Sequence, residues 1–128
     1  MYRYFDRYQL FVPVTLILFI FAVSKMSENQ TEQPKFVNIH FEVFGRVQGV
    51  FFRKHTQKRA SALGLGGYCM NTEKGTVTGV MEGNVEKVEI MKKWLREVGS
   101  PSSRIDKAEF TKEISIPRQY EKEFIVRL

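Results

Sequence analysis

The stretch KFVNIHFEVFGRVQGVFFRKHTQKRASALGLGG, residues 35–67, contains three structural signals in immediate succession. Residues 35–44 alternate apolar and polar side chains, the period-two pattern of a strand with one buried face. Residues 53–63 place apolar side chains at helical spacing, and glycines follow them, as is typical of a helix end. The segment therefore predicts a strand, a glycine-containing loop and a helix.

The remainder of the chain extends this pattern. Two β-prone segments, residues 68–72 and 76–83, are joined by a tight turn and predict a hairpin. Residues 84–99 predict a second helix, capped by Asn84, with an apolar stripe formed by Val88, Met91, Leu95 and Val98. Residues 104–114 and 122–128 predict a fourth strand and a short final strand, with a proline breaking the chain between them.

The order of these elements indicates the fold class. Strand, helix, strand, strand, helix, strand is the ferredoxin-like split β-α-β arrangement of the α+β class, here with a short C-terminal strand added. We expect an antiparallel sheet with both helices on one face. The folded domain is expected to span residues 36–128.

Composition limits both size and partners. With 128 residues, 43% of them hydrophobic, the chain can bury one modest core. Its net charge of +6 favours anionic partners, whether nucleic acid, acidic lipid or a small phosphorylated metabolite. The single cysteine, Cys69, excludes an intramolecular disulfide or a multi-cysteine zinc site, and His40 and His55 lie far apart in sequence. We therefore expect no metal site built from several cysteines or histidines.

The first 25 residues differ from the rest. The uncharged apolar run at residues 10–23 is short for a membrane span but suits a signal-peptide core. Asp6 and a domain without disulfides count against secretion. Met26 opens a polar tail, residues 26–35, that would serve as an ordinary start. Residues 1–25 are thus a signal or anchor, or an alternative or mis-assigned start.

Localisation follows from these two interpretations. We favour a cytoplasmic protein, with a secretory or membrane-anchored one as the alternative, and we expect membrane contact only if residues 10–23 are retained. Asn29 begins a glycosylation sequon, so a secretory route would allow a sugar there.

The loop GRVQGVFFR, residues 45–53, suits an anion. Its two glycines let backbone amides point inward and form an anion-binding nest. The helix that follows presents unpaired N–H groups and the positive end of its dipole. Arg53 adds a planar, cationic guanidinium group that can donate two hydrogen bonds to one anion, whereas Arg46 is expected to face solvent. The alternative interpretation is a plain turn with a solvated arginine.

GRVQGVFFR, followed by GGYCMNTEKGTVTGVMEG and VGSPSSRID, resembles acylphosphatase of the eukaryotic common/muscle type over Phe36 to Leu128. The resemblance implies a small ferredoxin-like hydrolase that converts acyl phosphates to a carboxylate and inorganic phosphate without a metal or cofactor. It implies that the loop amides hold the phosphoryl group, that Arg53 binds phosphate and that Asn71 positions the attacking water. The predicted substrate-binding residues are Gly45, Arg46, Val47, Gln48, Gly49, Val50 and Phe51.

Departures from the family pattern are few. Phe51 stands where a smaller residue, often cysteine, is familiar, and Met70 replaces a lysine beside Asn71. Cys69 is expected to be a buried, inert thiol, and the SPSSRID segment a structural loop whose Arg104 pairs with a carboxylate. The departures at Phe51 and Met70 are expected to tune the affinity for the substrate rather than abolish it.

Two other function classes remain as alternatives. An RNA-binding module shares this strand-helix order, but such modules carry stacking aromatics on the third strand, and residues 76–83 have none. A non-catalytic phospho-ligand module would not need Arg53 and Asn71 together. We therefore expect a monomeric enzyme acting on small acyl phosphates, with no nucleic-acid partner.

Overall fold

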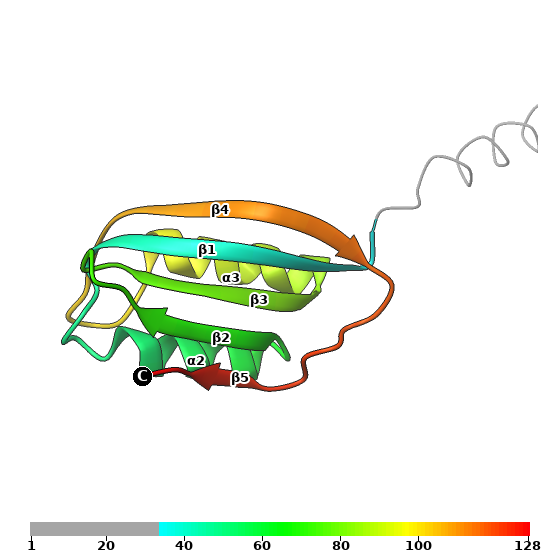
Figure 1. Cartoon of the computed structure of the whole chain (residues 1–128), viewed down its shortest axis with the longest axis horizontal. Coiled ribbons are helices and arrows are strands. Elements are labelled where there is room, and N and C mark those ends of the chain that lie inside the picture. The colour runs from blue at the N-terminus through cyan, green and yellow to red at the C-terminus, as the bar shows by residue number, and fades with distance from the viewer. Residues whose placement is uncertain (1–33) are drawn as a thin grey trace, which may run out of the picture. The chain divides into compact units, whose positions relative to one another are not determined.

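The computed structural model describes residues 34–128, in which the strands and helices follow the order that the sequence predicts (Figure 1). The expectations for the apolar leader, for most of the polar tail and for Asn29 lie outside these residues. No helix within residues 34–128 is long and apolar enough to cross a membrane. The elements are β1 (Phe36–Arg46), α2 (Phe52–Ala62), β2 (Gly66–Asn71), β3 (Val77–Asn84), α3 (Val85–Glu97), β4 (Arg104–Ile116) and β5 (Phe124–Val126).

β1 is an interior strand of the sheet, and one of its faces is apolar because every second side chain is apolar. These alternate side chains are buried and face the helices: Val37, Ile39, Phe41 and Val43. β1 pairs antiparallel with β3 on one side and with β4 on the other, and the full strand order is β4-β1-β3-β2-β5. Figure 1 shows α2 and α3 on one face of this sheet, which confirms the ferredoxin-like α+β class.

The last strand corrects one detail of the prediction. We expected an antiparallel sheet, but β5 pairs parallel to β2, so the sheet is mixed. The reason is topological. β4 ends at the same end of the sheet at which β2 begins, and residues 117–123 cross that end rather than the length of the sheet (Figure 1). β5 therefore enters beside β2 in the same direction.

A buried carboxylate holds this crossing segment in place. Glu82, on β3, is only 4% exposed. It accepts hydrogen bonds from the backbone N–H groups of Tyr120, at 2.7 Å, and Glu121, and from the side-chain amide of Asn38 at 2.8 Å. A buried charge is tolerated when donors satisfy it, and here three do. Glu82 thus fixes the path that leads into β5.

The two helices follow the predicted caps and stripes with one exception. Asn84 caps α3 by accepting from the N–H of Glu86 at 2.9 Å, and the side chains at positions 88, 91 and 95 are buried. Val98, expected on the same stripe, is 60% exposed because α3 ends at residue 97. On α2, Phe52 is buried and packs against Trp94 of α3, with ring centroids 5.8 Å apart.

Candidate active site

The loop between β1 and α2 has the backbone geometry of an anion cradle. Gly49 has φ +73° and Phe51 has φ +57°, so left-handed residues interrupt the loop just before α2. Within the described chain, no backbone N–H of residues 47–51 donates to a backbone carbonyl. Together with the free N–H groups of the first turn of α2, these amides are donors without a backbone partner, as an anion-binding loop requires.

The first residue of the loop, Gly45, is a glycine for a steric reason. Its φ is +133°, and a Cβ atom built there would lie 2.1 Å from the backbone oxygen of Arg104. No side chain fits such a contact, so only glycine lets β1 and β4 approach each other at this point. Arg104 itself pairs with Asp106 at 3.1 Å, which confirms its expected carboxylate partner.

Two side chains, one within the loop and one outside it, anchor the loop to neighbouring segments. Gln48 donates from Nε2 to the backbone oxygens of Thr72 and Thr76, each at 2.9 Å, and thereby ties the loop to the β2–β3 turn. The buried hydroxyl of Ser100 donates to the backbone oxygen of Val50 at 2.8 Å. Ser100 opens the SPSS segment, so that segment supports the loop structurally, as the sequence predicts.

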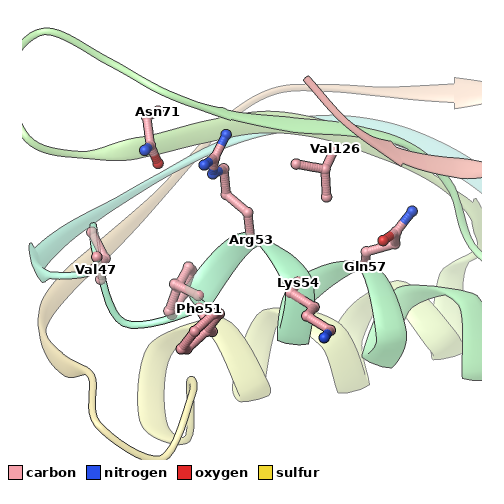
Figure 2. Close-up of a pocket in the computed structure, with 9 residues that line it drawn as sticks. Val47, Phe51, Arg53, Lys54, Gln57, Asn71 and Val126 are labelled. Atoms are coloured by element: carbon pink, nitrogen blue, oxygen red, sulfur yellow. The ribbon is translucent and has the colours of Figure 1, made fainter. Parts of the chain in front are cut away.

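A cavity of about 560 Å³ lies between the loop, the start of α2 and the ends of β2 and β5. Figure 2 shows the side chains that line it. Its lining residues are Val47, Gly49, Phe51, Phe52, Arg53, Lys54, Gln57, Asn71 and Val126. Of the predicted site residues, five therefore meet here. The other four predicted residues do not line it: Gly45, Arg46, Gln48 and Val50.

Arg53 is held in position by the C-terminal end of the chain. Its Nη1 donates to the backbone oxygen of Arg127, just after β5, at 2.9 Å. In Figure 2 the side chain rises from the first turn of α2 toward β2, the strand that carries Asn71. The remaining guanidinium N–H groups can therefore serve an anion in the cavity.

Asn71 presents an unsatisfied acceptor. Among residues 34–128, its Oδ1 is the only buried side-chain nitrogen or oxygen without a hydrogen-bond partner. A buried polar atom left unpaired costs about 1–3 kcal/mol, so such an atom in a native protein calls for an explanation. Asn71 also lines the cavity, so its side-chain amide lies in the wall of the space where a water or ligand would bind.

Cys69 lies two residues before Asn71, but it is more deeply buried than Asn71. It is fully buried, and burial raises the pKa of its thiol to about 12, while the charge of Arg53 lowers it by a smaller amount. At neutral pH the group is a thiol, and the thiol form is a poor nucleophile. The sequence-based expectation of an inert thiol agrees with this.

A polar network supports the turn that follows Asn71. Thr76 donates to Glu42 at 2.6 Å, and its hydroxyl also lies 2.6 Å from that of Thr72. The hydrogen bond from Thr76 and, to a smaller extent, the nearby Lys74 lower the pKa of Glu42. Since Gln48 binds both threonine carbonyls, the network links the loop to the strand that bears Asn71.

Sequence reasoning missed several residues of the cavity. Gln57 lies one helical turn beyond Arg53, so helical periodicity from Arg53 could have indicated it. Lys54 carries no sequence signal beyond that of a polar helix residue. Val126 and the Arg127 carbonyl carry no sequence signal, since any residue supplies a backbone oxygen. No group of three or more His, Cys, Asp or Glu side chains suited to a metal ion occurs in the portion the structure describes.

Comparison with known proteins settles the family. The sequence model for acylphosphatase matches residues 39–126. The chain belongs to the acylphosphatase family. Acylphosphatase-1 of Xenopus laevis is 51% identical over 89 residues, which cover 70% of this chain and 88% of that protein. Acylphosphatase-2 of Mus musculus is 51% identical over 90 residues, covering 70% and 85%.

The solved structures agree with this assignment. The acylphosphatase of Coxiella burnetii superposes with a TM-score of 0.64 at 33% identity, over 76% of this chain and all of that one. This acylphosphatase is therefore an enzyme that resembles the common and muscle types, as the sequence motifs suggested.

Proposed function

We propose that this acylphosphatase hydrolyses the carboxyl-phosphate anhydride of acyl phosphates to a carboxylate and inorganic phosphate without a metal ion. Arg53 and the amides of loop 45–51 hold the phosphoryl group, and Asn71 aims the attacking water. The observation that carries the proposal is that Arg53 and Asn71, whose buried Oδ1 has no hydrogen-bond partner, line the same cavity.

The reaction requires little covalent chemistry from the protein. An acyl phosphate already has a good leaving group, so holding the phosphoryl group, neutralising its oxygens and aligning a nucleophile supply most of the catalysis. The water oxygen forms a bond to phosphorus as the bond to the carboxyl oxygen breaks, and the carboxylate leaves with the electron pair. The proton of the water passes to a phosphoryl oxygen of the substrate, so no protein base is required.

Each group has a distinct share in this step. The loop amides and the guanidinium of Arg53 donate to the phosphoryl oxygens, where negative charge is greatest. Asn71 accepts a hydrogen bond from the water and, being neutral, does not repel the incoming anion. All of these groups come from one chain, so the proposed activity does not need a second subunit.

The test is hydrolysis of benzoyl phosphate by the full chain with a chelator present. Replacing Arg53 with Gln should lower kcat/KM by about a hundredfold or more and weaken inhibition by phosphate. Asn71→Ala should lower kcat to a similar degree yet leave phosphate inhibition in place. Arg59→Gln, which removes a charge from the same helix outside the cavity, is the matched control.

Two outcomes would refute the proposal. One is the absence of hydrolysis by the unaltered chain in the presence of chelator. The other is undiminished hydrolysis by both Arg53→Gln and Asn71→Ala. Phosphate binding without any turnover would instead indicate a non-catalytic phospho-ligand module.

A further inference from the structure

A second hollow adjoins the catalytic cavity along α2. It has a volume of about 330 Å³ and is lined by Phe51, Lys54, His55 and Lys58. Phe51 and Lys54 line both spaces, so the hollow begins where the catalytic cavity ends. In Figure 2, Lys54 leaves the first turn of α2 in a different direction from Arg53, away from Asn71.

The charge of this hollow is uniformly positive. α2 contains four cationic residues and no acidic one. Within residues 34–128, neither Lys54 nor Lys58 forms an ion pair, although five pairs occur elsewhere in that part of the chain. The two lysines are four positions apart, which places them on the same side of the helix. An anion in the hollow would therefore meet two cations that have no competing partner there.

His55 closes the hollow without adding negative charge. Its Nδ1 lies 2.9 Å from the backbone oxygen of Phe51, a position from which a protonated Nδ1 donates to that oxygen. The other ring nitrogen is left for solvent or a ligand. No carboxylate lines the hollow, so nothing in it opposes an anionic group.

Phe51 separates the two spaces and has an unusual conformation. Its side chain is 73% exposed, and its φ of +57° is a left-handed conformation that costs a non-glycine residue about 1–2 kcal/mol. An exposed aromatic ring held in this way offers an apolar surface beside the phosphoryl site. The hydrocarbon part of an acyl group bound at that site could pack against it.

We propose that the hollow receives the acyl end of the substrate, and that Lys54 and Lys58 select acyl phosphates that carry a second anionic group, a carboxylate or a phosphate, on that end. The inference rests on the proposed function, because it takes the phosphoryl group to occupy the cavity of Arg53 and Asn71. The acyl carbon chain then passes Phe51, and the second anion lies between the lysines. Uncharged acyl groups use the ring of Phe51 alone.

The test compares two substrates that differ by one charge, benzoyl phosphate and 4-carboxybenzoyl phosphate, on the full chain. The measured quantity is the ratio of their kcat/KM values, carboxylated over uncarboxylated. We expect Lys58→Gln to lower this ratio about fivefold, in keeping with a partly solvated charge pair, and Lys58→Glu to lower it further. Lys58→Arg, which retains the charge, should preserve the ratio. The effect should weaken as ionic strength rises.

Arg59→Gln is the matched control, because it removes the neighbouring charge from α2 without touching the hollow. An equal fall of the ratio in Lys58→Gln and Arg59→Gln would mean that the overall charge of the helix causes the effect, and it would overturn the inference. An unchanged ratio in Lys58→Glu would overturn it as well. If the unaltered chain hydrolyses benzoyl phosphate in either case, the proposed function stands and only the subsite is refuted. If it hydrolyses neither substrate, both fail.

Discussion

The guanidinium of Arg53 donates to the backbone oxygen of Arg127 at 2.9 Å, although 74 positions separate the two residues. The contact joins the first turn of α2 to the chain just after β5. In the same place the N–H of Arg127 donates to the backbone oxygen of Cys69 on β2, also at 2.9 Å. The end of the folded domain thus orients the proposed phosphate-binding arginine.

A chain that ends at Val126 lacks this carbonyl and should lose activity. A hydrogen bond to a charged group is worth about 1.5–3 kcal/mol, so we expect kcat/KM for benzoyl phosphate to fall at least about tenfold. The control is a chain that lacks only Leu128 and keeps the oxygen of Arg127. Equal activity of the two shortened chains would show that the contact does not orient Arg53.

Gln48 is expected to affect catalysis although it lies outside the cavity. Gln48→Ala removes two hydrogen bonds between the loop and the β2–β3 turn, and should lower the free energy of unfolding by about 1–3 kcal/mol. It should also lower kcat, because the loop and Asn71 are no longer held together. Urea denaturation and steady-state kinetics measure the two effects.

Gln119→Ala is the matched control for that variant. Gln119 also donates from Nε2 to two backbone oxygens, those of Gly64 and Glu121, but at the far end of the sheet. It should cost stability and leave kcat unchanged. A parallel loss of kcat in both variants would attribute the effect to general destabilisation.

Phe51 allows a test of backbone strain. At an ordinary helix-adjacent position alanine is more stable than glycine, but at φ +57° the order should reverse. We expect Phe51→Gly to be more stable than Phe51→Ala by about 1 kcal/mol, measured by denaturant unfolding. Both variants lack the ring, so their difference isolates the backbone. Alanine more stable than glycine would contradict the left-handed geometry.

Glu42 should contribute an acid-sensitive part of the stability. The hydrogen bond from Thr76, followed by the influence of Lys74, lowers its pKa in the folded state below the ordinary value of 4.5. A lowered pKa means that the stabilisation is present above pH 4.5 and is lost as the pH falls through the folded-state pKa. The stability difference between the unaltered chain and Glu42→Gln should therefore shrink on acidification.

The exposed Glu109 serves as the control for the loss of a carboxylate. It pairs with Lys107 at the surface, and such pairs contribute little. Glu109→Gln should therefore change the free energy of unfolding at neutral pH only slightly. A difference for Glu42→Gln that stays constant from neutral pH to pH 3 would rule out the proposed linkage.

Most of the fold could be predicted from periodicity. The alternation in β1 and the stripe of α3 are strong because each element buries one face, and Asn84 marks a helix start by its own chemistry. β5 could be recognised as a strand but not paired correctly. It has only three residues, and its direction depends on where β4 ends and on the carboxylate of Glu82, neither of which is a local property.

The site was predictable only in part for the same reason. Glycines and a helix start indicated the proposed phosphate loop, and the proposed role of Arg53 followed from its place in it. Asn71 alone resembles an ordinary turn residue, and its importance came from the family resemblance. That its Oδ1 is buried without a partner depends on the tertiary surroundings. The backbone oxygen of Arg127 could not be predicted, since carbonyl groups are common to all residues.

Because Trp94 packs on Phe52, the fluorescence of Trp94 can report on the structure around Phe52. Trp94 is the only tryptophan in the sequence, and the ring it contacts belongs to the residue between Phe51 and Arg53. If the loop shifts when an anion binds at the proposed phosphate site, the indole contact should change with it. Its fluorescence is therefore expected to follow occupancy of the proposed site in the unlabelled protein, without a substrate being turned over.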